Sequence, residues 1–422
     1  LDNPLFLGDN CFGTVNESSF TSENGSVSFC QKGDISLQNI NIKVLNGEKP
    51  TDIHYFTTAL TCYGPGSCFV DDMHIDINGY VTVGFWKQDN TNKGGKCIIQ
   101  NTTVTGSSEA SLGIHNLEAV SVKNCKLFTK LEPSSNYDYS ISALSKDDIE
   151  TKVEVSDIIT NEVIRLNRFD SVSATNCNAK SISVYVYKPK SECTVIKNCS
   201  LNGFGYSNGS DSDKQDLVIE NCTFSNDAEV SVSNAKSITL YNDKLMKNPI
   251  LFSCESTGSI EGKVLAKNYY FNSFSALSGA KLSTVEFNDC KIDNEFNARG
   301  FYVSESISFI NVTFLKNYFF NDVYYIDCKS AIFNNCTFES NDNEYYFYKF
   351  SGESFRMENC TLRLGHRRKC IYALAKNECV FSNNKITGSY ADTSLYLLYR
   401  KNSTFTNTGN IFNDGKFTAK ES

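Results

Sequence analysis

The sequence predicts an all-β fold, a right-handed parallel β-helix in which coils of about 22 to 24 residues stack as a solenoid. Three observations lead to this prediction. A six-residue pattern, apolar-x-Asn-Cys-x-apolar, recurs along the chain at nearly constant spacing. The composition favours strands, with 30 Phe and 22 Tyr against 3 Met and 1 Trp. Only 6 of the 422 residues are proline, so long strand-rich runs are possible.

The Asn of the pattern, which is Asp at position 289, recurs in steps of 21 to 24 residues, apart from two longer steps of 47 and 52 that are each close to two coils. An amphipathic helix would repeat about every 3.6 residues, so the pattern favours short strands separated by bends, where Asn tolerates a left-handed backbone. Asn amides in successive coils can hydrogen-bond one another, and we expect these side chains to point inward. The clearest positions of this structural ladder are Asn124, Asn176, Asn198, Asn221, Asn311, Asn335, Asn359 and Asn383.

This pattern resembles the asparagine ladders of the right-handed parallel β-helix superfamily, which includes pectate lyases, viral tailspikes and many surface adhesins. The resemblance covers about residues 100–410. Coils such as 222–227 also resemble the Phe-x-x-Asn repeats of polymorphic surface adhesins. The resemblance implies a solenoid fold, and it implies either an adhesive role or an activity on polysaccharides.

The period divides the chain into three parts. Residues 1–35 are expected to be an N-terminal cap or the continuation of an upstream region, because solenoids need their terminal coils covered. Residues 36–410 are expected to form the β-helix, with loop insertions near 132–148 and 206–216, where Ser, Asn, Asp and Gly break the period. Residues 411–422 are expected to be a C-terminal tail.

Charge and hydropathy exclude two classes of partner. A net charge of −8 argues against a nucleic-acid partner, whose phosphates require a basic face. No apolar run approaches the roughly 18 residues of a membrane-spanning helix, so no membrane span is expected.

Seven of the 17 cysteines follow the repeat. Val312 occupies the slot after the Asn in one coil, which indicates an apolar interior site where Cys acts as a small hydrophobic residue. We therefore expect buried free thiols there and no metal site. A tight Gly-Pro-Gly turn makes Cys62 and Cys68 a disulfide candidate, with Cys11 and Cys30 a weaker one. The repeat positions are Cys125, Cys177, Cys199, Cys222, Cys290, Cys336 and Cys360.

Ten Asn-x-Ser/Thr triplets occur, and six of them begin at repeat Asn positions that we expect to be inaccessible. The remaining acceptors for glycosylation would be Asn16, Asn24, Asn208 and Asn402.

Five tyrosines of the C-terminal half recur in steps of 23 or 24 residues, in phase with the coils. A stripe of this kind could stack sugar rings, bind another subunit, or pack inside the solenoid. The sequence leaves these alternatives open, with packing or a subunit contact preferred. The stripe consists of Tyr302, Tyr325, Tyr348, Tyr372 and Tyr396.

Catalysis of polysaccharide cleavage would need paired carboxylates, or a base beside a cation or basic cluster. The best local group is Asp289, Asp293, Glu295 and Arg299 in one coil, and a second is the basic run 366–369. Neither matches the motifs of lyases or polygalacturonases, so both are weak catalytic candidates and no cofactor is expected.

The sequence thus favours an extracellular, cell-surface or virion-exterior rod: an adhesin, filament subunit or spike shaft. Such a rod would associate with itself or contact a surface polysaccharide. The alternative is a carbohydrate-active tailspike, or a polysaccharide lyase or hydrolase, because fold alone does not decide function.

Overall fold

The structure is a computed structural model of the chain. It describes residues 5–6, 13–22, 27–30, 34–47, 58–63, 66–79, 82–86, 95–107, 110–129, 139–145, 151–187, 189, 193–210, 213–254, 262–276, 281–297, 302–317, 326–340, 346–365, 368–388 and 393–422. The chain divides into two compact units, Leu1–Gln215 and Asp216–Ser422. The described residues of both units form strands and no helix.

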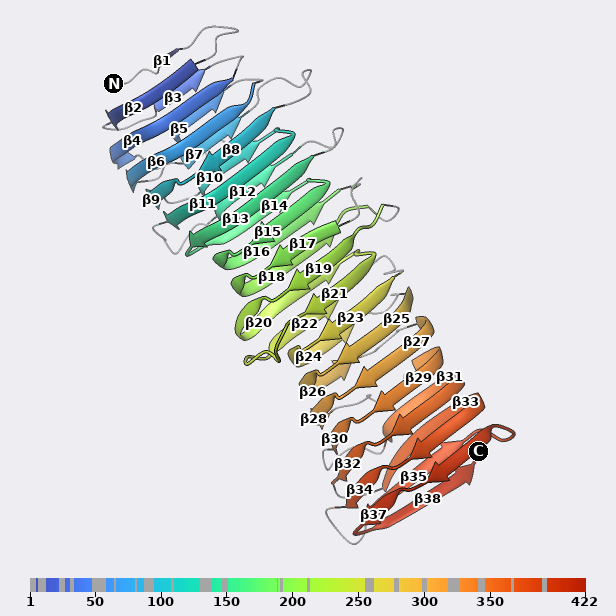
Figure 1. Cartoon of the computed structure of the whole chain (residues 1–422). Helices are drawn as coiled ribbons and strands as arrows, with labels where there is room; N and C mark the ends of the chain where they lie inside the picture. The colour runs from blue at the N-terminus through green and yellow to red at the C-terminus, as the bar shows by residue number, and fades with distance from the viewer. Residues whose placement is uncertain are drawn as a thin grey trace. The chain divides into compact units, whose positions relative to one another are not determined.

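The N-terminal unit runs from blue to green in Figure 1. Its strands are β1 (Leu5–Phe6), β2 (Gly13–Ser22), β3 (Val27–Cys30), β4 (Ile35–Gly47), β5 (Thr58–Tyr63), β6 (Cys68–Gly79), β7 (Thr82–Trp86), β8 (Lys96–Gln100), β9 (Thr103–Ser107), β10 (Ala110–His115), β11 (Ala119–Thr129), β12 (Tyr139–Leu144), β13 (Lys152–Thr160), β14 (Val163–Asn167), β15 (Ser171–Thr175), β16 (Asn178–Val186), β17 (Cys193–Lys197) and β18 (Ser200–Asn208).

The C-terminal unit continues through yellow to red in Figure 1. Its strands are β19 (Asp216–Glu220), β20 (Thr223–Ser233), β21 (Ser237–Tyr241), β22 (Ile250–Cys254), β23 (Lys263–Lys267), β24 (Tyr270–Ala276), β25 (Lys281–Asn288), β26 (Lys291–Asn297), β27 (Tyr302–Ile310), β28 (Thr313–Asn317), β29 (Ile326–Asn334), β30 (Thr337–Ser340), β31 (Tyr346–Glu358), β32 (Thr361–Leu364), β33 (Arg368–Ser382), β34 (Lys385–Gly388), β35 (Ser394–Tyr399), β36 (Thr404–Thr408), β37 (Ile411–Asn413) and β38 (Lys416–Glu421).

Strands pair in parallel with the strand that lies about one coil later in the sequence. In the N-terminal unit β4 pairs with β2 and β6, and Ile40 lies opposite Met73. In the C-terminal unit β31 pairs with β29 and β33. The strands of each unit form successive rungs in Figure 1. Each unit is therefore a parallel β-solenoid, as the repeat predicts.

Strand alternation separates the interior of each unit from its surface. In β17, Thr194 and Ile196 are buried while Cys193, Val195 and Lys197 are half-buried. All seven repeat cysteines are buried and lie outside any disulfide, and Val312 in the same slot is fully buried. The prediction of buried free thiols is therefore confirmed. Burial raises the pKa of Cys290 to about 12, although backbone N–H groups nearby oppose the shift.

A column of stacked phenylalanines fills the interior of the C-terminal unit. The ring centroids of Phe287 and Phe309 are 5.4 Å apart, and those of Phe309 and Phe333 are 5.1 Å apart. All three side chains are fully buried. Because successive coils supply equivalent residues, each ring packs against the ring of the next coil.

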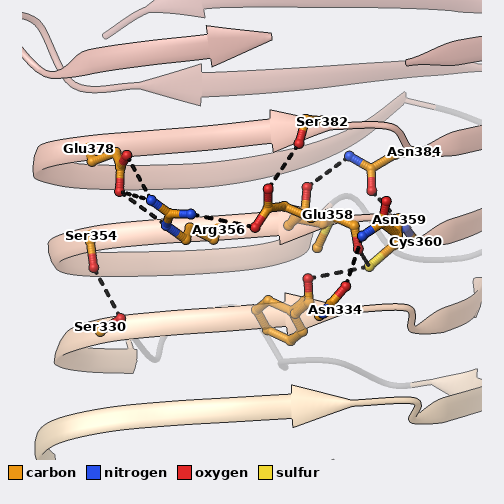
Figure 2. A network of polar contacts seen from close by, with 12 residues as sticks. Ser330, Asn334, Ser354, Arg356, Glu358, Asn359, Cys360, Glu378, Ser382 and Asn384 are labelled. Atoms are coloured by element: carbon orange, nitrogen blue, oxygen red, sulfur yellow. Dashed lines mark hydrogen bonds and ion pairs between the residues drawn. The ribbon is translucent and has the colours of Figure 1, made fainter. Parts of the chain in front are cut away.

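The repeat asparagines lie at the corners of the coils. All eight of the clearest positions have φ between 51° and 58°, in the left-handed region. Amide hydrogen bonds link some of them from coil to coil: Asn335 Nδ2 donates to Asn311 Oδ1 at 2.8 Å, and Asn124 Nδ2 donates to Asn101 Oδ1 at 2.7 Å. Figure 2 shows the Asn359 corner, where Asn359 Nδ2 donates at 3.0 Å to Asn334, the residue before the Asn335 corner.

The corner side chains point outward, which corrects our expectation that they point inward. Asn335 and Asn359 are exposed, and the cysteine that follows each of them is buried. The left-handed residue turns its own side chain to the surface and returns the next one to the interior. The Asn-x-Ser/Thr triplets that begin at such corners are therefore on the surface.

Coils extend beyond the expected limits of 36–410. β2 pairs with β4 within the expected N-terminal cap, and β38 pairs with β35 within the expected tail. The expected loop near 132–148 contains β12, and the one near 206–216 begins inside β18. Of these two expected loops, residues 132–138, 146–148 and 211–212 lie outside the described part of the chain.

The expected disulfide between Cys62 and Cys68 is wrong. Cys68 is buried outside any disulfide at the start of β6, directly opposite Cys97 of β8. Cys62 lies in β5, which pairs with β3 and β7 on another side of the coil. Cys11 of the weaker candidate pair lies outside the described residues.

Candidate functional site

Two of the four candidate catalytic residues have described side chains, and both bind neighbouring coils. Asp289 is a corner residue with φ of 53°, and its Oδ1 accepts a hydrogen bond of 2.9 Å from Asn311 Nδ2. Asp293 lies on β26, the strand that follows this corner. Glu295 is on the same strand without a described side chain, and Arg299 lies outside the described residues.

Asp293 belongs to a half-buried cluster with Tyr270 and Lys291. The Tyr270 hydroxyl donates to Asp293, and Lys291 Nζ lies 3.5 Å from Asp293 Oδ1. Lys291 Nζ also donates to Tyr270 Oη at 2.8 Å and lies 4.0 Å from the centre of its ring. Lysine therefore covers one face of this tyrosine, which is not an open platform for a sugar.

These contacts shift two pKa values in this cluster. Burial raises the pKa of Tyr270, and the carboxylate of Asp293 adds to this shift. Burial lowers the pKa of Lys291, but the Tyr270 hydroxyl and the Asp293 charge outweigh it, so the pKa is raised. Lys291 therefore stays a cation that neutralises Asp293.

The second candidate group, the basic run 366–369, falls mainly outside the described part of the chain. His366 and Arg367 lie outside it, and Arg368 and Lys369 begin β33 without described side chains.

The predicted tyrosine stripe is not a single file in the described strands. Register shifts interrupt the pairing at Tyr302 and between Tyr346 and Tyr348. Tyr372 and Tyr396 are both half-buried between buried neighbours, so both point outward, offset by two residues. Tyr325 lies outside the described residues, and a role of these tyrosines in assembly stays a prediction. Their partners in register are Asp327 for Tyr302, Ile371 for Tyr348, Lys349 and Leu398 for Tyr372, and Cys370 for Tyr396.

The polar network in Figure 2 joins β31 to β33 through an arginine–carboxylate ion pair. Arg356 donates from Nε and Nη2 to both carboxylate oxygens of Glu378, at 2.9 to 3.1 Å. Its Nη1 lies 3.7 Å from Glu358, which also accepts from Ser382 Oγ at 3.2 Å. Both carboxylates are therefore engaged with the arginine between them, in an arrangement that fastens one coil to the next.

An open groove crosses four strands of the N-terminal unit. Its volume is about 290 Å³, and we call it the His74 groove. The lining residues come from β2, β4, β6 and β9: Ser19, Phe20, Thr21, Asn41, Ile42, Lys43, His74, Ile75, Asp76, Thr103 and Thr105.

Register arranges the polar residues of the groove in two rows. The first row is Ser19, Asn41, His74 and Thr103, and the second is Thr21, Lys43, Asp76 and Thr105. The interior residues between the rows, such as Ile42 and Ile75, are buried, so strand alternation directs both rows outward. Neighbouring residues of a row are one coil apart, about 4.8 Å.

The groove combines donors and acceptors with a balanced charge. Thr105 Oγ1 donates to Asp76 Oδ1 at 3.3 Å, and Lys43 lies beside Asp76 in register. His74 Nε2 lies 3.6 Å from Asp72 Oδ1, and both side chains are more than half exposed. A set of hydroxyl, amide, imidazole, ammonium and carboxylate groups can hydrogen-bond a ligand rich in hydroxyls.

The groove was not predicted from the sequence, although a signal for it exists. After the corners, the pairs Asn41 and Lys43, His74 and Asp76, and Thr103 and Thr105 each occupy the same two outward positions of successive coils. Steps of 33 and 29 residues separate these early coils, longer than the usual 21 to 24, and they hide the common register.

Within the described ranges, no group of three or more His, Cys, Asp or Glu residues is arranged to hold a metal ion. The part of the chain that the structure describes contains no helix long and apolar enough to cross a membrane. Comparisons of the chain with protein-family models, curated proteins and solved structures found no match.

Proposed function

We propose that this protein is an exterior structural solenoid, on a cell surface or a virion, that adheres to a glycan through the His74 groove. The observation that carries the proposal is the pair of polar rows that repeats from coil to coil over four strands. An extended polymer that lies across the strands would present similar groups at each step. The spacing of about 4.8 Å per coil is comparable with one sugar ring of such a polymer.

The chemistry of the rows favours a polyhydroxylated ligand. Ser19, Thr21, Thr103 and Thr105 provide hydroxyls, and Asn41 provides an amide that donates and accepts. The groove contains one ammonium group and one carboxylate, so its charge favours neither a strongly anionic nor a strongly cationic polymer. The net charge of the chain, −8, argues in the same direction against a polyanion.

A parallel sheet holds the rows in place before a ligand arrives. Asn41 and His74 belong to strands paired over most of their length, so their backbones lose little freedom on binding. Preorganisation of this kind raises affinity because less conformational entropy is lost.

The experiment is a binding assay of the full chain against a panel of insoluble and soluble polysaccharides. Asn41→Ala, His74→Ala and Asp76→Ala should each weaken binding to whichever glycan the wild type retains. Glu154→Ala is the matched control, because Glu154 is an exposed carboxylate of the same unit outside the groove. A wild-type chain that binds no member of the panel, or groove variants that bind as well as the control, would contradict the proposal.

A further inference from the structure

The two polar rows do not stop at β9. In register, Thr103 lies opposite Lys126 of β11, and Thr105 lies opposite Phe128. The first row therefore continues with a cation, and the second row ends in an aromatic ring. Counting one coil per step, the surface from β2 to β11 is roughly 19 Å long.

Phe128 is unusual for its residue type. It is 39% exposed, and it is the only exposed residue among the phenylalanines whose side chains the structure describes. Its neighbour Leu127 is fully buried, so strand alternation directs the Phe128 ring outward. An exposed aromatic ring next to a polar groove is typical of a binding surface.

A bulge shapes the chain beside this ring. The register shifts between Phe128 and Thr129, where Thr129 lies opposite Ser107, so Gly106 of β9 is the extra residue. Gly106 has φ of 86°, and a Cβ there would lie 2.0 Å from the carbonyl oxygen of Ile77. Only glycine fits this position, and bulges redirect the side chains around them.

We infer that Phe128 is the ring-stacking platform of the proposed glycan site, and that the ligand is a neutral polymer of β-linked pyranose sugars. This inference rests on the function proposed above. Pyranoses with equatorial hydroxyl groups present a C–H face, which packs against the flat Phe128 ring. The hydroxyl groups of the following rings then meet Thr105, Asp76 and the rest of both rows.

Charge in the extended surface supports a neutral ligand. Lys43 and Lys126 supply two positive groups, and Asp76 with the adjacent Asp72 supplies two negative ones. A uronic acid polymer would meet two carboxylates as well as two lysines and gain no net attraction, whereas a neutral polymer leaves these charges balanced against one another.

Isothermal titration calorimetry of the full chain tests the inference with three neutral probes, cellohexaose, laminarihexaose and chitohexaose, and one acidic probe, hexagalacturonate. We expect at least one neutral probe to bind more tightly than the acidic one. Phe128→Ala should weaken that binding about two- to tenfold, since stacking of an aromatic ring contributes about 0.5 to 1.5 kcal/mol. Phe128→Tyr, which keeps the ring, should restore it.

Phe69→Ala is the matched control, because Phe69 of the same unit is half-buried and points outward on the strand segment before the corner. Phe69→Ala should bind the neutral probe with the affinity of the wild type. Unchanged affinity in Phe128→Ala with a loss in Asp76→Ala would overturn the platform and leave the proposed function standing. Preference for hexagalacturonate would overturn the ligand class. A wild type that bound none of these four probes but bound another polysaccharide of the panel would overturn the ligand class and leave the proposed function standing. A wild type that bound no glycan at all would overturn both.

Discussion

Replacement of Asn335 by alanine is expected to destabilise the C-terminal unit by about 2 to 3 kcal/mol. The backbone of Asn335 has φ of 55°, where a residue with an ordinary Cβ costs about 1 to 2 kcal/mol. The variant also loses the 2.8 Å hydrogen bond to Asn311, which contributes about 1 kcal/mol at an exposed site. Most of the loss should therefore come from the backbone conformation and not from the amide pairing.

Asn335→Gly separates these two contributions. Glycine adopts the left-handed region without steric cost, but it loses the same hydrogen bond and adds about 0.5 to 1 kcal/mol of chain entropy in the unfolded state. Its loss should be about 1.5 to 2 kcal/mol, smaller than that of the alanine variant. Urea unfolding followed by circular dichroism gives the free energies of unfolding.

Hydrogen exchange gives a local reading, because stacked repeats do not always unfold in one step. The backbone N–H of Asn335 donates to the Glu358 carbonyl at 3.0 Å, so its protection from hydrogen exchange reports on this corner directly. If Asn335→Ala proved as stable as Asn335→Gly, the left-handed corner would not be the source of the loss. If both variants had the same free energy of unfolding as the wild type, the reasoning would be refuted altogether.

Three further predictions concern the interior. Because burial raises the pKa of Cys290 to about 12, the folded state keeps this proton while the unfolded thiol loses it near pH 9. Stability should therefore be constant below about pH 9 and fall as the pH rises towards 12, and Cys290→Val should reduce that fall in alkaline denaturation curves. Titration with a thiol reagent should label few of the described buried cysteines in the native protein and many more in denaturant; rapid native labelling of seven or more would contradict it. Phe309→Ala should cost about 3 to 5 kcal/mol in urea unfolding and Phe309→Leu clearly less, since leucine refills most of the cavity between two stacked rings.

The fold could be predicted because every coil repeats the same local rule. Asn198, for example, combines a left-handed bend with an inward Cys199, and each such coil adds the same information. Periodicity of about two dozen residues therefore identified the solenoid, its corners and its buried thiols. The direction of the corner side chain was missed, since alternation along a strand does not say which way a left-handed residue turns.

The candidate site could not be predicted, because it depends on register between coils of unequal length. Lys43 and Asp76 are neighbours in one row of the groove although 33 residues separate them, well beyond the usual coil. The same reasoning failed in the opposite direction for the tyrosines. Tyr348 and Tyr372 are one period apart, yet a register shift places Ile371 opposite Tyr348. Sequence spacing alone does not count the extra residues that bulges and loops contain.

The outward corners also determine how the protein would tolerate chemical ageing. Asp157 and Asp289 occupy corners and accept hydrogen bonds from the asparagines that follow, Asn176 at 3.0 Å and Asn311 at 2.9 Å. A corner carboxylate is thus acceptable where the next coil supplies a donor. Deamidation of Asn311 would remove that donor and place two carboxylates one coil apart, about 4.8 Å, where like charges repel. Slow hydrolysis of one amide would therefore loosen the solenoid most at corners that already border an aspartate.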